Sequence, residues 1–380
     1  MNSILIVTGE NSGEKYGAGL VNQYKKISPS SSFFGIGGNA MEKQGVHLLY
    51  KIEDLSLVGF FEILSHLPRI QKISKRIKSE VKQRKSVAAV FIDSPDFNLR
   101  LAKSLKKMST PILYYVSPTV WAWREKRLKL IRKTVDKMLL IFPFEEEIYR
   151  RHSIPATYVG HPLKESIKIT LSKNIFFKKY DLDPEKVVIA ILPGSRKSEI
   201  QFHMPILIPA LQRIKRELDV QFVLPLAENI RPELIERHMA HPFPQLKIIN
   251  TNKYEALAYS HLAIASCGTV NLETALLGTP LISFYRISPL TYFFGIRLVK
   301  VKDYSIVNIL AGKKIIPELI QRQFTSNNIY EETKKILSSP KIQEEMKAEF
   351  KKINDLLGEK SASKNAAQEL NALIRGENQT

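Results

Sequence analysis

The chain has 380 residues, of which 44% are hydrophobic and 25% are charged, an ordinary composition for a soluble globular protein of two or three domains. Its formal net charge of +20 favours polyanionic partners such as nucleic acid, an anionic membrane surface or phosphorylated substrates. Cys267 is the only cysteine, which excludes an intrachain disulfide and a zinc site built from cysteines and indicates a cytoplasmic protein.

The first apolar run, residues 4–7, predicts a strand. It has no basic segment before it and ends at Thr8, so it does not fit a signal peptide. No later apolar run approaches the roughly 20 residues that a membrane-spanning helix needs. Apolar runs alternate with helical patterns, as in βαβ units, and predict an α/β fold. The other strands are expected at residues 32–34, 87–92, 112–116, 137–142, 187–192, 221–224, 246–249, 262–265 and 281–284.

This alternation breaks once, between about Pro162 and Lys186, where the chain is polar and rich in lysine. We therefore expect two doubly wound domains, residues 1–163 and 187–327, joined by a linker at 164–186. Ligands of such sheets bind at the carboxyl ends of the strands, so the two domains should face a central cleft. Residues 328–380 are expected to form charged helices and a polar tail.

The turn after the first strand, residues 9–14, carries Glu10 and Ser12. We expect both at the rim of the cleft, where Glu10 is either a substrate contact or a helix cap. Residues 35–40 fit the G-x-G-x-x-G/A dinucleotide pattern, which raises the hypothesis of a nicotinamide-dependent oxidoreductase. The pattern follows the second strand, and the next acidic residues, Glu53 and Asp54, come earlier than the roughly 20 residues expected, which favours a loop that shapes the cleft.

Residues 55–67 are apolar beyond what one helix face needs, and a basic helix follows them. This pair suits contact with a membrane surface, in which apolar side chains enter the acyl region and lysine and arginine meet the headgroups. The alternative is a core helix followed by a solvated one. The candidate membrane contacts are Leu57, Val58, Phe60, Phe61 and Leu64.

Two carboxylates flank Pro95 at the end of the third expected strand. Proline should hold Ser94 in an extended conformation and carry Asp93 past the strand end, which makes Asp93 the candidate general base. Asp96 is placed to cap the following helix. Further along, Trp121 and Trp123 alternate before Arg124, and packing under a loop is favoured over stacking on nucleic-acid bases.

A glycine and an arginine follow the strand expected at 187–192. Gly194 allows close backbone approach to a phosphate, and Arg196 could bind it through two hydrogen bonds, with Ser195 between them. The spacing is not that of a P-loop. Asp181 and Asp183 form an Asp-x-Asp pattern, but capping explains it better in this interdomain stretch, and no metal is predicted.

The most informative motif covers residues 266–280, where a buried strand is expected to turn into a helix at Gly268 and Thr269. A helix N-terminus there suits a diphosphate, and Glu273 could accept hydrogen bonds from two ribose hydroxyls. The motif therefore indicates a nucleotide-sugar site that also includes Ser266. The alternative is a capped helix in which Glu273 offsets the helix dipole.

Together these motifs resemble those of bacterial lipid-A-disaccharide synthases. The resemblance extends from the first strand to about Gln321, and the Ser-Pro-Thr-Val-Trp-Ala-Trp-Arg string at 117–124 is highly specific. The matching stretches are residues 9–14, 92–98, 115–124, 193–196, 268–269 with Glu273, and 307–312.

The resemblance implies a GT-B fold and a metal-independent, inverting transfer. The donor would be UDP-2,3-diacylglucosamine and the acceptor 2,3-diacylglucosamine 1-phosphate (lipid X), giving a β-1,6 disaccharide and UDP. It assigns the base to Asp93, phosphate binding to Arg196 and a donor contact to Asn308. Glu10 joins the catalytic candidates, and Ser12 and Asp96 those on the acceptor side.

Two positions depart from the family pattern: Glu14, where aspartate is usual, and Val270-Asn271, where two small residues are usual. Asn271 is the departure that could alter donor contacts. The resemblance also implies a homodimer, and a peripheral location on the cytoplasmic face of the inner membrane, where anionic lipid accounts for the basic charge without nucleic acid. No cofactor is expected. A different class, a basic lipid- or RNA-binding protein on a degenerate transferase scaffold, is opposed by intact Asp93, Arg196 and Glu273.

Overall fold

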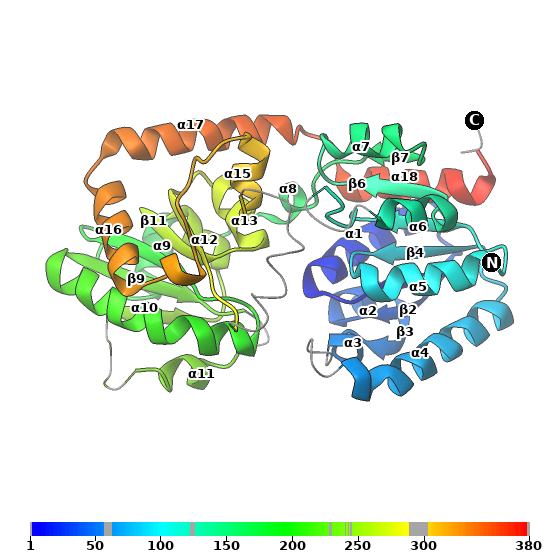
Figure 1. The fold of residues 1–380 in the computed structure, drawn as a ribbon, viewed down its shortest axis with the longest axis horizontal. Helices are drawn as coiled ribbons and strands as arrows, with labels where there is room; N and C mark the ends of the chain where they lie inside the picture. The colour runs from blue at the N-terminus through cyan, green and yellow to red at the C-terminus, as the bar shows by residue number, and fades with distance from the viewer. Residues whose placement is uncertain are drawn as a thin grey trace. The chain divides into compact units, whose positions relative to one another are not determined.

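The computed structural model describes residues 2–56, 63–121, 126–227, 230–239, 241, 243, 245–288 and 303–377. The chain forms two compact units, the first from residues 1–165 and 357–380 and the second from residues 166–356. Each unit contains one parallel sheet with helices around it (Figure 1). The change from the first unit to the second falls between Glu165 and Ser166, within the polar stretch 164–186.

The first unit has a seven-stranded sheet in the order β3-β2-β1-β4-β5-β6-β7. The strand order reverses between β1 and β4, whose last residues Thr8 and Ile92 are paired, so the turns that follow lie side by side. The strands are β1 (Ser3–Thr8), β2 (Ser32–Gly37), β3 (Val46–Lys51), β4 (Ala88–Ile92), β5 (Ile112–Tyr115), β6 (Lys137–Leu140) and β7 (Ala156–Tyr158).

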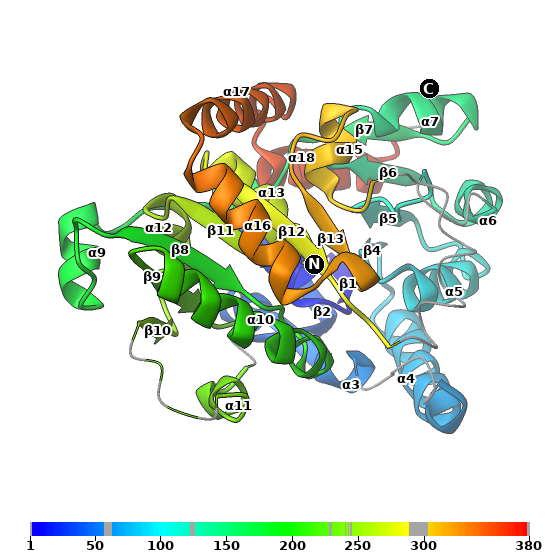
Figure 2. The ribbon, with the colours of Figure 1, turned by 60° about the vertical axis from the view of Figure 1, so that its left-hand side comes forward.

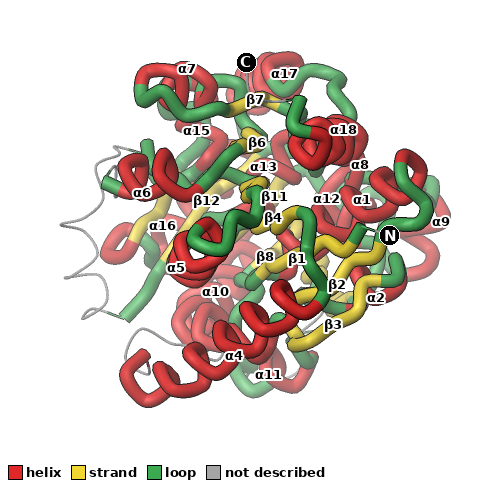
Figure 3. The backbone as a smooth tube through the Cα atoms, turned by 90° about the vertical axis from the view of Figure 1, so that its right-hand side faces the viewer, coloured by secondary structure: helices red, strands yellow, loops and turns green. Residues whose placement is uncertain are grey.

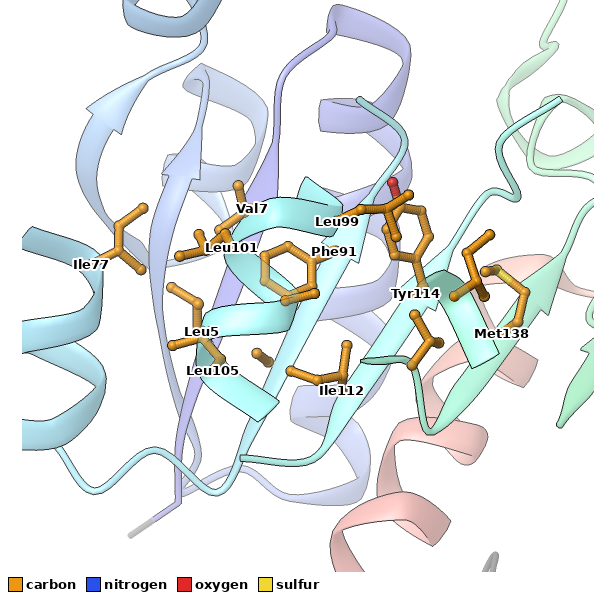
Figure 4. Packing of buried hydrophobic residues seen from close by; sticks show 14 of the residues in the cluster. Leu5, Val7, Ile77, Phe91, Leu99, Leu101, Leu105, Ile112, Tyr114 and Met138 are labelled. Carbon is orange, nitrogen blue, oxygen red and sulfur yellow. The ribbon is translucent and has the colours of Figure 1, made fainter. Parts of the chain in front are cut away.

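Both faces of this sheet are buried, which explains why its central strands are continuously apolar. In β1, Leu5 and Val7 join the core beneath α4, α5 and α6, while Ile4 and Ile6 join the core beneath α1 and α18 (Figures 3 and 4). The helices of this unit are α1 (Asn11–Ile27), α2 (Asn39–Lys43), α3 (Glu53–Ser56), α4 (Ile63–Gln83), α5 (Pro95–Lys106), α6 (Arg127–Thr134), α7 (Glu145–Arg151), α8 (Leu163–Ser166) and α18 (Ala362–Arg375).

The second unit has a six-stranded parallel sheet in the order β10-β9-β8-β11-β12-β13. Its strand order reverses between β8 and β11, where Leu192 pairs with Ala265. The turns after these strands therefore meet at the carboxyl edge. The strands are β8 (Val187–Leu192), β9 (Val220–Pro225), β10 (Leu246–Ile249), β11 (Leu262–Ser266), β12 (Leu281–Tyr285) and β13 (Glu318–Ile320).

Helices α10 and α16 pack together and lie over one face of this second sheet (Figure 2). Helix α17 packs against α13 and α15. The helices of the unit are α9 (Lys173–Lys179), α10 (Lys197–Glu217), α11 (Pro232–Glu236), α12 (Lys253–Ala258), α13 (Thr269–Leu276), α15 (Ile306–Ala311), the 3₁₀ helix η1 (Gln321–Gln323), α16 (Ser326–Leu337) and α17 (Pro340–Leu356).

The predicted α/β fold is confirmed, and each of the ten strands expected from the sequence is present. Three strands were not expected: β3, a partly exposed strand at the sheet edge, and β7 and β13, which have only three residues each. The chain after residue 328 is helical, but it is divided between the units, because α16 and α17 belong to the second and α18 to the first. No helix in the described part of the chain is long and apolar enough to cross a membrane.

Candidate active site

In the first unit, the turns after β1 and β4 touch each other. A Cβ atom on Gly9 would lie 2.4 Å from the Ser94 hydroxyl oxygen, so the two turns are closely packed here. Glu10 is exposed and stands at the N-cap of α1, yet its side chain makes no capping hydrogen bond. Ser12 lies in the first turn of the same helix. Capping therefore does not explain Glu10, which directly follows the glycine that contacts the Asp93–Ser94 turn.

The backbone of Asp93 and Ser94 is left-handed, with φ of 50° and 45°. The prediction that Pro95 holds Ser94 extended is therefore wrong, and the cause is a set of hydrogen bonds to residues of β5 and α5. The Asp93 carbonyl accepts from the Tyr114 hydroxyl at 2.6 Å and from the Asn98 amide at 2.8 Å, while its N–H donates to the Tyr115 carbonyl. Two adjacent left-handed residues cost on the order of 1–3 kcal/mol each, and such strain concentrates at functional sites.

Asp96 is not the N-cap of α5, because the helix begins one residue earlier, at Pro95, with Ser94 as its cap. Asp96 lies in the first turn, where a carboxylate complements the helix dipole. It is mostly exposed and forms an ion pair with Arg127, at the start of α6. The structure thus places Asp93, Ser94 and Asp96 in one turn, next to Glu10 and Ser12.

The glycines of residues 35–38 do not form a dinucleotide-binding turn. Gly35 and Gly37 belong to β2, and a Cβ on Gly35 would lie 1.9 Å from the Ile6 carbonyl oxygen on the neighbouring strand. The Glu14 carboxylate accepts a hydrogen bond at 2.5 Å from the Ala40 N–H, at the start of α2. The glycines therefore allow close packing of strands and of Glu14, which removes the motif that suggested an oxidoreductase.

Trp121 packs against aromatic rings, as the sequence favoured. Its ring meets Phe144 edge to face at 5.4 Å, and its Nε1 donates to the Glu145 carboxyl at 3.2 Å. Glu145 is buried, and burial raises its pKa to about 8.

Several sequence candidates lie outside the described residues. These are Trp123 and the apolar membrane candidates Leu57, Val58, Phe60 and Phe61. The backbone of Leu64 is described, but its side chain is not.

In the second unit, the predicted phosphate turn is held by the first turns of α10. The Glu199 carboxylate accepts hydrogen bonds from the N–H groups of Ser195 and Arg196, at 2.8 and 3.1 Å. Gly194 has a φ of 132°, and a Cβ there would lie 2.5 Å from the same carboxylate oxygen, so glycine is required on both counts. The Arg196 side chain is 62% exposed, which leaves its guanidinium at the surface of the turn.

Helix α13 begins at Thr269, where the sequence predicted the change from strand to helix, and Gly268 is its cap. Gly268 has an extended backbone, and no described atom lies within 4 Å of the position that its Cβ would take. Glycine there is required neither by the backbone angles nor by packing, and it leaves open space in front of the helix N-terminus. Ser266 is buried at the end of β11, where its carbonyl accepts from the Asn271 amide.

Glu273 lies on α13 one turn after Thr269 and is already held by two residues of α12. Lys253 Nζ lies 2.8 and 2.7 Å from its two carboxylate oxygens, and the Tyr254 hydroxyl donates to one of them at 3.1 Å. A carboxylate offers about four acceptor positions. These three contacts therefore leave only part of that capacity for a ligand hydroxyl. The contact with α12 could not be predicted from the spacing within the motif.

Asn308 and Asn271 are both fully buried. The Asn308 amide donates to Ile316 and Glu318 and accepts from the N–H groups of Ile315 and Ile316, which uses its full bonding capacity. Asn271 joins Ser266 to Ser283 and Ser305, and Ser305 caps the helix that carries Asn308. The two asparagines thus stabilise the framework behind the carboxyl edge.

The Asp-x-Asp pattern lies in a turn and caps no helix. Asp181 pairs with Lys247 at 2.9 Å, and Asp183 accepts from the Glu185 N–H at 3.0 Å. Among the described residues, no group of three or more histidine, cysteine, aspartate or glutamate side chains could hold a metal ion.

The comparisons with known proteins agree over nearly the whole chain. A family model described as lipid-A-disaccharide synthetase matches residues 4–372. The chain belongs to the lipid-A-disaccharide synthase family. It is 37% identical to the lipid-A-disaccharide synthase of Solibacter usitatus, with 99% of each chain covered, and 38% identical to that of Syntrophus aciditrophicus, again with 99% of each covered. As a family member the protein is a glycosyltransferase.

Solved structures of more distant proteins share the fold. A UDP-GlcNAc 2-epimerase of Neisseria meningitidis bound to UDP-GlcNAc superimposes with a TM-score of 0.65 at 14% identity, covering 98% of this chain and 100% of that one. The calicheamicin glycosyltransferase CalG4 gives a TM-score of 0.65 at 12% identity, covering 99% and 98%. The family fold is therefore GT-B, with two Rossmann-like units.

The motifs used for the sequence predictions missed Glu199, His203, Lys253 and Tyr254. Glu199 and His203 stand one turn apart on α10, directly after the predicted phosphate turn, so a helical projection from Ser195 would have found them. Lys253 and Tyr254 gave no such signal, because they come from another helix.

Proposed function

We propose that this protein transfers 2,3-diacylglucosamine from UDP-2,3-diacylglucosamine to the 6-hydroxyl of 2,3-diacylglucosamine 1-phosphate, giving a β-1,6 disaccharide and UDP. Membership of the lipid-A-disaccharide synthase family is the observation that carries this proposal. The acceptor O6 forms the new bond to the donor's anomeric carbon while the bond from that carbon to the diphosphate breaks. The negative charge of the leaving group then stays on UDP.

We assign the base to Asp93, which takes the proton of the attacking hydroxyl. The rigid left-handed turn supports this role, because it fixes the backbone of Asp93 at the carboxyl edge. Glu10, Ser12 and Asp96 lie in the same pair of turns and are assigned to the acceptor side.

We assign the donor to the second unit. The exposed Arg196 and the N-terminus of α13 would stabilise the departing diphosphate, since both present positive charge or N–H groups to it. The open space at Gly268 supports close approach of a phosphate. Gly194, Ser195, Ser266 and Thr269 complete the donor side, with Glu273 on the ribose and Asn308 positioning the framework.

The acylated substrates also motivate a membrane contact on the cytoplasmic face of the inner membrane. Helix α4 buries Ile73 and Ile77 and exposes Lys72, Lys75 and Lys82, which supports its attraction to anionic headgroups. A homodimer is proposed from the family resemblance alone.

A UDP-release assay with the purified protein and the two acylated sugars tests the reaction, with mass spectrometry of the product. The expected result is stoichiometric UDP and disaccharide. Binding of the sugars without UDP release would contradict the proposal and indicate a lipid-binding protein on a transferase scaffold.

A further inference from the structure

His203 connects two turns at the carboxyl edge of the second sheet. It is fully buried on α10, one turn after Glu199. Its Nδ1 lies 2.6 Å from the Pro193 carbonyl oxygen, in the turn after β8. Its Nε2 lies 3.1 Å from the backbone nitrogen of Arg286 and 3.0 Å from the carbonyl oxygen of the same residue, directly after β12.

These contacts fit the neutral imidazole with the proton on Nδ1. Nδ1–H donates to Pro193, while Nε2 accepts from the Arg286 N–H. Burial lowers the pKa of His203, which agrees with a neutral ring. One rigid ring therefore fixes the backbone of Arg286 relative to the phosphate turn that carries Arg196.

A second link between the same turns comes from Glu199. The Tyr285 hydroxyl donates to Glu199 Oε1 at 3.2 Å, while Oε2 of that carboxylate holds Ser195 and Arg196. Glu199 and His203, on successive turns of α10, thus both connect the end of β12 to the turn after β8 through hydrogen bonds.

Strand register places the end of β12, which leads to Arg286, beside the end of β11, which leads into α13. Ser266 of β11 pairs with Phe284 of β12, and the Cys267 N–H donates to the Phe284 carbonyl at 2.7 Å, so the ladder continues past the strand end. Gly268 and Arg286 each stand two residues beyond this pair, so both follow the carboxyl ends of adjacent strands.

The Arg286 side chain is exposed, and within the described residues no hydrogen bond or ion pair involves its guanidinium. A fixed backbone that carries a charged side chain at the surface suits a ligand contact better than a structural role. An arginine offers five donors in a planar fork that matches phosphate oxygens.

We propose that Arg286 is a second diphosphate-binding arginine of the donor site, and that His203 is its positioning residue. Arg196 and Arg286 then stand on the turns that flank Gly268, on either side of β11, and their charges meet the two phosphates of a nucleoside diphosphate. This inference rests on the proposed function, because it takes UDP as the ligand.

The test compares UDP with uridine, which lacks the phosphates, by calorimetric titration of the full chain. R286Q should weaken UDP binding about tenfold or more, as expected for a lost hydrogen bond to a charged group, and leave uridine binding unchanged within about twofold. R286K, which keeps the charge but loses the fork, should fall between wild type and R286Q. R216Q is the control, because Arg216 lies in the last turn of α10, at the other end of that helix from the phosphate turn, and is 76% exposed. It should bind both ligands like wild type.

A double-mutant cycle tests the positioning role of His203. H203L should weaken UDP binding, and adding R286Q to it should have less than about a twofold further effect, since both changes remove one interaction. H203Q retains a group able to accept from the Arg286 N–H, so it should bind UDP more tightly than H203L does. If H203L does not fold, H203Q takes its place in the cycle. Fully additive effects would overturn the positioning role.

UDP binding by R286Q at wild-type affinity, or an equal loss of uridine affinity, would overturn the assignment of Arg286. A wild-type protein that does not bind UDP would instead contradict the proposed function, so the two failures are distinguishable.

Discussion

The buried carboxyl group of Glu145 accepts a hydrogen bond from the Trp121 indole at 3.2 Å, and the Phe142 N–H lies 3.4 Å from its other oxygen. These partners join the turn after β5 to the start of α7. Burial raises the pKa of Glu145 to about 8, so the folded protein holds this group protonated at neutral pH.

Stability should therefore fall as pH rises through the range between the ordinary pKa of glutamate and about 8. In that range the unfolded chain has released the proton and the folded chain retains it, so each pH unit costs up to about 1.4 kcal/mol. E145Q, a neutral mimic, should lose this dependence. Urea denaturation at pH 6 and pH 8 measures it, and an unchanged pH slope in E145Q would contradict the role of Glu145.

Asp93→Asn should lower kcat by about 10² to 10⁴, because general base catalysis contributes this much. The fold should be retained, since the hydrogen bonds that hold the turn involve the backbone of Asp93. Asp355→Asn, at an exposed position of α17 outside the proposed site, is the control and should keep kcat within about threefold. A D93N enzyme with full kcat would remove Asp93 from the chemistry.

Glu273→Gln should weaken UDP binding about tenfold, because an amide offers fewer acceptors to two ribose hydroxyls and the Lys253 contact is lost with it. Binding of 2′,3′-dideoxy-UDP should be weak in the wild type and change little in the variant. Calorimetry with both nucleotides checks this. An equal loss for both would place Glu273 away from the ribose.

Asn308→Ala should destabilise the second unit by about 3 kcal/mol, because it leaves several buried backbone and carboxylate groups without partners. Asn327→Ala, at an exposed position in α16, should cost less than about 0.5 kcal/mol. Denaturation midpoints compare the two variants. If N308A were as stable as wild type and lost only UDP affinity, Asn308 would be a direct donor contact.

Replacing Lys72, Lys75 and Lys82 of α4 with glutamate should reduce sedimentation with vesicles that contain anionic lipid, since each basic residue contributes about 1 kcal/mol near such a surface. The matched control replaces Lys341, Lys347 and Lys351, three exposed lysines of α17. That triple variant should sediment like wild type. Equal losses in both would indicate a general effect of net charge.

Ten of the thirteen strands in the described residues, and the start of α13 at Thr269, could be predicted from sequence alone. Strands buried on both faces are continuously apolar, which makes them readable. The edge strand β3 is partly exposed and lacks this pattern. Short strands such as β7 carry too few residues for a pattern. The candidate residues at strand ends followed directly, because parallel strands share one carboxyl edge.

Tertiary contacts decided what those residues do. Tyr114 and Asn98 turn Asp93 and Ser94 into the left-handed region, where proline alone predicts an extended chain. Lys253 meets Glu273 from another helix, and the buried partners of Asn308 come from residues that follow it in the chain. Helix α18 packs on α1 of the first unit although it follows the second. Hydrogen bonds and packing with residues outside each motif set these outcomes, and the local pattern of polarity within a motif carries no information about them.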